Sequence, residues 1–336
     1  MNILITTLGD GSLKLFKEAV GKEGKIFASN SKMTKALLTA DGYVLTPLIN
    51  DDTYIDFLIS YCQKNEITAI ISFIELDMVV LAKNKDRFNQ YGITVVLSDA
   101  SKIELCNDKW KCHQFLLSIG LKQPKTYIDI NLLKQDLQFG YISFPLIFKP
   151  RWGVGSFALY QVDEFEEIDV IYRKINSEII KSTFIKLESK QDLDSCVIMQ
   201  EKLSGQEYGL DVLNDLQGNY VTTIPKTKTE MRDGQTVKSR VDSNKPFEHT
   251  AKKISQNLKH IGNIGVDCFL TKSGDVFVIE INPRFAAHYA FAHLAGARFQ
   301  KQIIEWLSGK ATTTEYISYK TGIMGYRDIP QVVRYY

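Results

Sequence analysis

The first hundred residues alternate between short apolar runs and amphipathic stretches. The apolar runs predict strands at NILITT (2–7), KIFASN (25–30), YVLTP (43–47), TAIISF (68–73) and ITVVLS (93–98). The amphipathic stretches predict helices, most clearly at LKLFKEAV (13–20), YIDFLISYCQKN (54–65) and ELDMVVLAKNKDRFNQ (75–90). Strands that alternate with helices of about 10 to 15 residues imply a parallel, doubly wound sheet. We therefore expect residues 1–100 to form an α/β domain.

After Ser98 the pattern changes to α+β. The stretch SDASKIELCNDKWKCHQFLLSIG (98–120) predicts one or two helices, with Asn107 or Asp108 as the N-cap of the second and Gly120 at its end. Residues 121 to about 200 predict a smaller lobe with strands at FPLIFKP (144–150), FALYQV (157–162) and CVIMQE (196–201). A glycine-containing turn and a charged helical stretch separate these strands.

Longer strands follow in the last third of the chain. They are predicted at YGLDVLND (208–215), YVTTIPKTKT (220–229), TVKSRVD (236–242), GVDCFLTK (265–272) and VFVIEIN (276–282). The turns NDLQGN and TKSGD between them favour antiparallel hairpins. Helical patterns occur at 249–262 and 299–310, and the segment 311–336 is expected to return and pack on the body.

Composition and charge exclude several classes of protein. The chain has 336 residues, of which 44% are hydrophobic and 24% charged, as in an ordinary globular protein of two or three lobes. A net charge of +2 gives no general reason to expect a nucleic acid or a membrane as partner. The start lacks the pattern of a signal peptide, and the five cysteines show no CxxC spacing. We expect a cytoplasmic protein with reduced thiols.

Two carboxylates are predicted to meet in the hairpin around TKSGD. Asp267 in GVDCFL and Glu280 in VIEIN lie on strands joined by this short turn, so they should sit side by side on one face. Like charges so placed need a cation, and with the amide of Asn282 they form a ligand set suited to Mg²⁺. The alternative is two acidic residues paired with Arg284 and a lysine at the rim of the sheet.

Three further stretches contain candidate binding residues. Lys149 precedes RWGVGS, which is no Walker A loop but could place backbone N–H groups and the Ser156 hydroxyl over phosphates; a plain hairpin turn is the alternative. QEKLSGQE could present a backbone hinge to an adenine edge and a carboxylate to a ribose, or be a surface hairpin. The basic run 225–240 favours a polyphosphate or a carboxylate ligand over single-stranded nucleic acid. Its cations are Lys226, Lys228, Arg232, Lys238 and Arg240.

Some side chains are candidates for substrate contact. Glu75 and Asp77 follow the end of a predicted strand, where α/β sheets tend to place ligands, although they could equally be acidic residues at a helix N-terminus. His288 follows the Arg284 turn, and Arg232 belongs to the basic run. The turn GDGS (9–12) lacks the third glycine of a dinucleotide-binding fingerprint, so a plain tight turn is the favoured interpretation.

Taken together and in this order, these segments resemble the ATP-grasp superfamily, and in particular its short stand-alone members similar to the carbamoyl-phosphate synthase large subunit. ELCNDKW, MRDGQTVKSR and EINPRF are the stretches that carry the likeness. The resemblance implies a Rossmann-like domain at 1–100, an ATP-grasp domain at 101–310 with a small lid lobe at about 121–200, and a C-terminal tail at 311–336. A homodimer is implied only by the resemblance.

The resemblance also implies roles for individual residues. Lys109 and Lys149 would hold the phosphates of ATP, covered by Gly153, Gly155 and Ser156. Glu201, Lys202 and Leu203 would meet adenine and Glu207 the ribose. Asp267, Glu280 and Asn282 would hold Mg²⁺, with Mn²⁺ as an alternative, and Arg284, with Lys149 and Arg240, would act in catalysis. Asp267 stands where many relatives have Glu, and RFAAH lacks glycines that often follow this arginine.

The function implied is an ATP-dependent carboxylate–amine ligase that acts through an acyl phosphate and releases ADP and phosphate. Its substrates would be a small carboxylate and an amine. A kinase of the same fold, which leaves the phosphoryl group on its product, is the first alternative. A non-catalytic nucleotide-binding subunit is the second, and a dehydrogenase is disfavoured by the incomplete glycine fingerprint.

Overall fold

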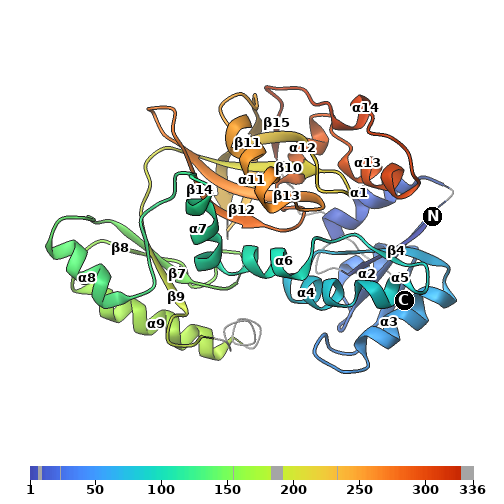
Figure 1. Ribbon diagram of the computed structural model, residues 1–336, viewed down its shortest axis with the longest axis horizontal. Coiled ribbons are helices and arrows are strands. Elements are labelled where there is room, and N and C mark those ends of the chain that lie inside the picture. Colours follow the sequence, from blue (N-terminus) through green and yellow to red (C-terminus); the bar gives the residue numbers. More distant parts are fainter. Residues whose placement is uncertain (7–9, 23, 154, 183–191, 233, 327–336) are drawn as a thin grey trace.

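The computed structural model describes residues 1–336 except 7–9, 23, 154, 183–191, 233 and 327–336. The described residues form three sheets (Figure 1). A parallel sheet and a small antiparallel sheet lie toward opposite ends of the long axis, and a larger antiparallel sheet lies between and above them. No helix among the described residues is long and apolar enough to cross a membrane.

The N-terminal part is a five-stranded parallel sheet in the order β3-β2-β1-β4-β5. Its strands are β1 (Asn2–Thr6), β2 (Lys25–Asn30), β3 (Gly42–Leu45), β4 (Ile67–Ser72) and β5 (Thr94–Val95). The helices between them are α1 (Asp10–Val20), α2 (Lys35–Thr39), α3 (Tyr54–Lys64), α4 (Glu75–Lys83) and α5 (Lys85–Asn89). This confirms the predicted parallel, doubly wound sheet.

Two expected elements in this part differ from the structure. The helix predicted over 75–90 is broken at Asn84, whose side chain donates a hydrogen bond of 2.9 Å to the carbonyl of Val80. An Asn side chain that bonds the local backbone competes with helix continuation, so two shorter helices form. The strand predicted over 93–98 pairs only at β5, because β4 offers it partners at Ala69 and Ile70 alone.

The segment that leaves this sheet forms two helices, α6 (Ala100–Asn107) and α7 (Lys109–Ser118). Asp108 separates them and is the N-cap of α7, since its Oδ1 accepts hydrogen bonds from the backbone N–H groups of Trp110 at 3.0 Å and Lys111 at 3.2 Å. Both of its oxygens also receive the guanidinium of Arg151, at 2.7 and 2.8 Å. One carboxylate therefore caps the helix and fixes the strand that carries Lys149 beside it.

A small lobe follows, built on a four-stranded sheet in the order β6-β9-β7-β8. Its strands are β6 (Thr126–Tyr127), β7 (Leu146–Pro150), β8 (Tyr160–Val162) and β9 (Val197–Glu201), and its helices are α8 (Ile130–Gln138) and α9 (Glu167–Lys181). The core of the lobe includes the fully buried side chains of Leu146, Phe148 and Ile175. β6 and α8 were not expected from the sequence.

The remaining strands form a six-stranded sheet in the order β14-β13-β10-β11-β12-β15. They are β10 (Gln206–Asn214), β11 (Tyr220–Arg232), β12 (Gln235–Val241), β13 (Gly262–Leu270), β14 (Val276–Asn282) and β15 (Met324–Tyr326). The accompanying helices are α11 (Glu248–Leu258), α12 (Tyr289–Leu294), α13 (Phe299–Leu307) and α14 (Thr314–Ile317). The expected antiparallel hairpins are confirmed.

Side-chain alternation gives the two faces of this sheet different environments. Tyr208, Leu210 and Val212 of β10 pack with the core residues of α6, α7 and α11. The other face carries Gly209 and Asp211, and further along it Leu213 packs with Phe285, Tyr289 and the N-terminal sheet. The C-terminal segment adds β15 to the edge of the sheet, where it pairs with β12. The rest of the expected tail, 327–336, lies outside the described residues.

Candidate active site

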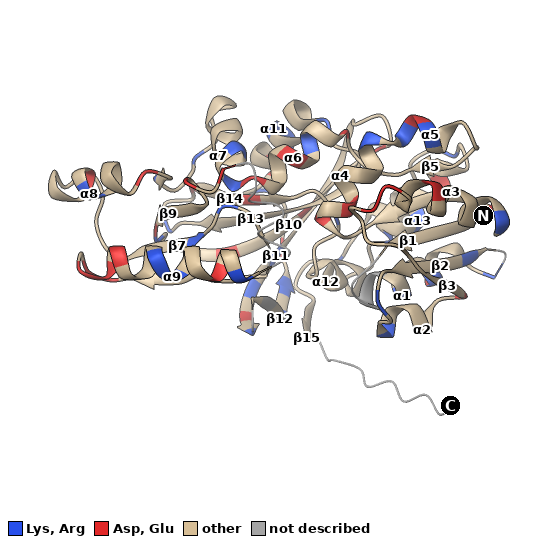
Figure 2. Cartoon of the chain, turned by 90° about the horizontal axis from the view of Figure 1, so that it is seen from below, with Lys and Arg blue, Asp and Glu red and all other residues tan. Residues whose placement is uncertain are grey.

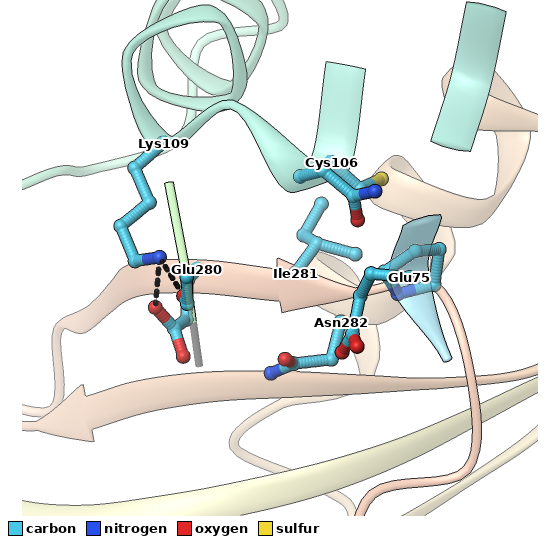
Figure 3. Close-up of a pocket in the computed structure, with 9 residues that line it drawn as sticks. Glu75, Cys106, Lys109, Glu280, Ile281 and Asn282 are labelled. Atoms are coloured by element: carbon cyan, nitrogen blue, oxygen red, sulfur yellow. Dashed lines mark hydrogen bonds and ion pairs between the residues drawn. The ribbon is translucent and has the colours of Figure 1, made fainter. Parts of the chain in front are cut away.

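A pocket lies where three parts of the chain meet, and it measures about 310 Å³ when the space open to solvent is included (Figure 3). Its lining residues are Glu75, Cys106, Asn107, Lys109, Gly153, Glu280, Ile281, Asn282 and Pro283. Glu75 comes from the first turn of α4, Lys109 from the start of α7, Gly153 from the small lobe, and Glu280 and Asn282 from the end of β14. The fold therefore brings together residues that the sequence places more than two hundred positions apart.

The two carboxylates of the β13–β14 hairpin lie side by side as predicted. Asp267 pairs with Glu280 in the register, and Gly265 pairs with Asn282 two residues further along. The amide of Asn282 lies 3.4 Å from Oδ2 of Asp267. Figure 3 shows the carboxylate of Glu280 directed to Lys109, and the side chain of Asn282 beside that of Glu75.

Three lysines surround this acidic pair. Lys228 of β11 contacts Glu207 at 2.7 Å and Asp267 at 2.8 Å. Lys109 donates a hydrogen bond of 2.6 Å to the carbonyl of Gly153, and its ammonium lies 3.9 Å from Glu280. Lys149 is 8% exposed and lies near enough to Glu280 to affect its charge.

The pKa values of the carboxylates and lysines diverge. Burial would raise the pKa of Glu280, but Lys109, Lys149 and Lys228 together outweigh it and lower the pKa to about 2. Burial raises the pKa of Asp267, although Lys228 opposes that effect. Burial lowers the pKa of Lys149, whereas for Lys228 the carboxylates of Asp267 and Glu207 prevail over burial and raise the pKa. Such divergence within one small volume is typical of functional sites.

The glycine-containing loop of the small lobe reaches the β11–β12 hairpin. Gly153, Gly155 and Ser156 have positive φ angles of 108°, 69° and 58°. A Cβ atom on Gly234, at the tip of the hairpin, would lie 2.7 Å from both the Gly155 carbonyl oxygen and Ser156 Oγ. Only a glycine permits this approach, so the loop and the hairpin tip close over the same side of the molecule. Val154, between the two glycines, lies outside the described residues.

The predicted adenine and ribose residues lie along the path from β9 to β10. The backbone N–H of Glu201 donates to the carbonyl of Lys125 at 3.0 Å, and its Oε1 accepts from the backbone N–H of Lys125 at the same distance. Lys202 points to Gln161, with Nζ 2.6 Å from Oε1, and Leu203 is half-buried. Glu207 is joined to Asp267 through Lys228.

Arg284 and Glu75 link the N-terminal part to the rest of the site. The Nε and Nη2 atoms of Arg284 both lie 2.5 Å from Oε1 of Glu75, which is 5% exposed. The Nη1 atom donates to the carbonyl of Phe285 at 3.3 Å. Of the predicted substrate residues, Glu75 thus lines the pocket and also holds the predicted catalytic arginine.

Asp77, two residues after Glu75, is not brought to the pocket. Its carboxylate is completely buried and accepts hydrogen bonds from Thr6, from Tyr54 at 2.7 Å and from Ser72 at 2.9 Å. These contacts tie α4 to the carboxyl ends of β1 and β4 and to α3. The geometry gives Asp77 a structural position instead of one that faces a ligand.

The two predicted arginines of the basic run also lie away from the pocket. Arg240 pairs with Thr227 in the register, so its side chain lies on the opposite face of the sheet from Lys226 and Lys228, where it contacts Asp242 at 2.7 Å. The side chain of Arg232 is 73% exposed near the hairpin tip. In Figure 2 basic positions are visible along the β11–β12 hairpin.

His288 is buried beside the acidic pair. It is 6% exposed, and its Nε2 lies 3.8 Å from Oδ1 of Asp267. Neither ring nitrogen has a hydrogen-bond partner among the described residues. A Cβ atom on Gly209 would lie 2.5 Å from Nε2, so the absence of a side chain at 209 makes the room that the imidazole occupies. Burial lowers the pKa of His288 well below its ordinary value, so the ring is neutral.

Three residues of the site were not singled out from the sequence. Lys228 was grouped with the basic run, although strand alternation places it on the face of Glu207 and Asp267. Asn107 was considered only as a cap, and it lines the pocket. Arg151 was passed over, and its bond to Asp108 fixes the strand that carries Lys149. The cysteines are buried and free, as expected, and burial raises the pKa of Cys106 and Cys268.

The donor set fits a hard divalent cation that also binds phosphate. No cluster of three or more His, Cys, Asp or Glu side chains suited to a metal occurs within the described part of the chain. Asp267, Glu280 and Asn282 would supply two carboxylates and one amide oxygen, and Mg²⁺ commonly completes its octahedron with phosphate oxygens and water. These residues therefore fit Mg²⁺ bound together with a polyphosphate.

The sequence profile of the ATP-grasp domain matches residues 106–288, more than half of the chain. The chain belongs to the ATP-grasp family. A second profile, that of the N-terminal domain of PylC-like proteins, matches residues 3–96. The family resemblance and the fold class expected from the sequence are thereby confirmed. The roles of the individual site residues remain predictions.

One curated relative of this ATP-grasp chain illustrates a distant likeness. The carbamoyl phosphate synthase large chain of Thermoplasma volcanium is 24% identical over 252 residues, which cover 69% of this chain and 22% of the relative. The chain thus spans about a fifth of the length of the curated relatives it matches.

Solved structures with the same fold include ligases. Biotin carboxylase from Campylobacter jejuni superposes with a TM-score of 0.74 at 17% identity and covers 96% of this chain and 74% of that one. An L-amino acid ligase from Bacillus licheniformis gives 0.73 at 18% identity and covers 98% of this chain and 81% of that one. At these identities the likeness shows the fold.

Proposed function

We propose that this ATP-grasp protein is a ligase that uses Mg²⁺ and ATP to join a small carboxylate to an amine, with an acyl phosphate as intermediate. The observation that supports it most is the meeting of Glu280 and Asn282 with Lys109 at one pocket, with Asp267 paired to Glu280 and Lys149 near it. Carboxylates poised beside lysines are what a site for a metal-bound polyphosphate requires.

The chain's own residues would divide the work as follows. Lys109 and Lys149, with the loop of Gly153, Gly155 and Ser156, would bind the phosphates. Glu201, Lys202 and Leu203 would contact adenine and Glu207 the ribose. Asp267, Glu280 and Asn282 would hold Mg²⁺, which neutralises charge on the phosphates when bound. This assignment keeps every cationic group of the pocket near the expected negative charge.

The proposed ligase reaction has two steps, phosphoryl transfer to the acid and then attack by the amine. A carboxylate oxygen of the acid attacks the γ-phosphorus, the bond to the bridging oxygen of ADP breaks, and an acyl phosphate forms. The amine then attacks the acyl carbon, phosphate leaves, and the amine loses a proton. Arg284, which Glu75 contacts at 2.5 Å, would stabilise the negative charge of the acyl phosphate. The small lobe would exclude water, which would otherwise hydrolyse the intermediate.

The alternative of a kinase shares the first half of this chemistry and differs in its product. The test is product analysis of the purified full chain with Mg-ATP and pooled amino acids, small carboxylates and amines. ADP with free phosphate and a new condensed mass is the expected result. ADP with a product heavier by one phosphoryl group would establish the kinase instead. ATP binding without turnover on any pool would contradict the ligase.

Two variants connect the products to this pocket. Glu280→Gln should abolish the condensed product, because it removes a metal-binding charge without a change of shape. Glu248→Gln makes the same chemical change at the start of α11, far from the pocket in the sequence, where Glu248 pairs with Lys252 at 2.6 Å. This variant should keep full activity. Equal loss in both variants would point to unfolding and not to the site.

A further inference from the structure

The ammonium group of Lys228 lies between two carboxylates that come from different strands. Its Nζ is 2.7 Å from Oε1 of Glu207 on β10 and 2.8 Å from Oδ1 of Asp267 on β13, and its side chain is 7% exposed. To reach Asp267 the lysine crosses β10, where the residue paired with Asp267 is Gly209. One largely buried cation is thus shared by the residue expected to contact ribose and a residue expected to hold Mg²⁺.

The two contacts of Lys228 are not equivalent. Its Nζ donates a hydrogen bond to Glu207. Oδ1 of Asp267 is close enough for an ion pair, but it lacks a contact with hydrogen-bond geometry to any residue that the structure describes. Nε2 of His288, 3.8 Å from the same oxygen, is also without a hydrogen-bond partner among these residues. A buried carboxylate oxygen that is held by charge alone is weakly held, so Asp267 can exchange this cation for another.

The charged groups of the active site are gathered in and beside the first pocket, which Glu280 and Lys109 line. A second pocket, of about 340 Å³ when the space open to solvent is included, adjoins it at Pro283, which lines both. Of the residues that line the second pocket only Arg284 is charged, and Glu75 balances that charge. Most of its other lining residues are apolar. The charges around the acidic pair are therefore balanced within and beside the first pocket.

Cations and anions around the acidic pair are matched in number among the described residues. They are the carboxylates of Glu207, Asp267 and Glu280 and the ammonium groups of Lys109, Lys149 and Lys228. A dication that arrives alone meets no excess of negative charge, and Lys228, in contact with one of its expected ligands, repels it. The phosphates of a nucleotide would supply the missing negative charge.

We propose that Lys228 makes the binding of Mg²⁺ depend on the bound nucleotide. Without nucleotide, its ammonium shares the charge of Asp267, and the metal binds weakly. When the phosphates of a nucleotide lie by Lys109 and Lys149, their negative charge offsets that of Lys228, and Asp267 becomes available to the metal. Lys228 is then a positioning residue that acts through Asp267. The proposal rests on the proposed function and adds the order in which its ligands bind.

The first test measures metal binding to the full chain without nucleotide. Mn²⁺ is the probe, and electron paramagnetic resonance measures the free ion. Lys228→Met keeps the apolar part of the side chain and removes the ammonium, and should lower the dissociation constant of Mn²⁺ by about tenfold or more. Lys228→Arg keeps the charge, and should bind Mn²⁺ as weakly as the wild type.

Two other lysines separate this effect from a general loss of positive charge. Lys109→Met removes an ammonium that is 3.9 Å from Glu280 and donates to the Gly153 carbonyl, so it should change Mn²⁺ binding by less than about threefold. Lys122→Met breaks an exposed ion pair of 2.7 Å with Asp275, at the turn between β13 and β14, and should leave Mn²⁺ binding unchanged.

The second test measures the dependence on nucleotide. Calorimetry gives the affinity of a non-hydrolysable ATP analogue with and without Mn²⁺, because the coupling between two ligands is reciprocal. Mn²⁺ should raise the affinity for the analogue in the wild type, and this gain should be about tenfold smaller in Lys228→Met. The affinity of Mn²⁺ for the free analogue is the same in both cases and cancels in the comparison.

Each result decides the proposal. A gain of Mn²⁺ affinity and a loss of coupling in Lys228→Met alone would support it. An equal gain in Lys228→Arg or Lys109→Met, no gain in Lys228→Met, or no coupling in the wild type would overturn it, while the ligase function would stand. The measurement of coupling in the wild type needs no variant. A lack of Mn²⁺ binding even with the analogue present would overturn the proposal together with the metal ligands on which the proposed function rests.

Discussion

The two adjoining pockets differ in the charge and polarity of the residues that line them. The first is lined or surrounded by charged groups, with Glu280, Lys109 and Glu75 in its wall and Asp267 and Lys228 beside them. The second is mainly apolar, with one unpartnered amide oxygen at Asn263. The N-terminal α/β part and the large antiparallel sheet contribute to both. The comparison teaches that this fold keeps charged and apolar surfaces apart in two adjoining pockets, with Arg284 in the wall of the second and Glu75, its partner, in the wall of the first.

The largest effect on activity is expected when a charge is removed from the first pocket. Glu280→Gln should lower the rate of ADP formation by about 10³-fold, as the loss of a single preorganised charge does in other active sites. The rate is measured by coupled ADP release under saturating ATP and Mg²⁺. A variant within tenfold of the wild type would remove Glu280 from the site.

Weakening the junction between the pockets should have a smaller effect. Glu75→Gln keeps the size of the side chain but loses the charge that holds Arg284, so kcat/KM for the acid should fall by about 10- to 100-fold. The KM for ATP should change little, because Glu75 acts on the acid through Arg284. An equal rise in both KM values would contradict this separation.

The neighbourhood of the acidic pair can be tested through its packing. Gly209→Ala would place a Cβ atom 2.5 Å from His288 Nε2, and should lower the free energy of unfolding by about 1–3 kcal/mol. Urea denaturation measures the change. His288→Ala in the same chain should recover part of the loss, because it removes the clash. Additive effects of the two substitutions would show that the ring does not fill this space.

The charged pocket should also respond to acid. The pKa of Glu280 is lowered from 4.5 to about 2, so its ionised form stabilises the folded chain above pH about 4.5. That stabilisation is lost as the pH falls toward 2. The difference in free energy of unfolding between the wild type and Glu280→Gln should therefore shrink over this range. A difference that stays constant between pH 5 and pH 3 would contradict the lowered pKa.

The smallest effect is expected outside both pockets. Arg240→Ala should change activity by less than about twofold, because the side chain is exposed on the opposite face of the sheet and pairs with its neighbour Asp242. Steady-state kinetics with both substrates measure it. A loss of tenfold or more would restore the catalytic role that the sequence suggested for Arg240 and would place the site on a wider surface.

The parts of the site that could be predicted from the sequence are those set by local rules. A short turn and strand alternation place Asp267 beside Glu280, and the Asp-Lys-Trp stretch places a cap at Asp108. The contact of Glu75 with Arg284 joins residues 209 positions apart, and no periodic pattern encodes it. The registers of β10 against β11 and β13, and of β11 against β12, decide that Lys228, and not Arg240, meets the carboxylates.

The elements that were missed are also explained by physical causes. β6 is only two residues long and exists because Thr126 and Tyr127 pair with β9, a tertiary contact that leaves no periodic signal. α8 had a local signal, since Oδ1 of Asp129 caps it by accepting from the backbone N–H groups of Asn131 at 2.8 Å and Leu132 at 3.3 Å. An Asp followed by an amphipathic stretch would have been enough to predict it.

The ion pair between Glu75 and Arg284 has a consequence for anyone who would recombine this protein. The N-terminal α/β part cannot be exchanged independently of the rest of the chain. It carries Glu75, whose ion-pair partner Arg284 follows β14. A chimera that takes residues 3–96 from a relative also takes the relative's residue at position 75. If that residue is not acidic, Arg284 loses its ion-pair partner. Successful chimeras should therefore be those in which the two positions are transferred together.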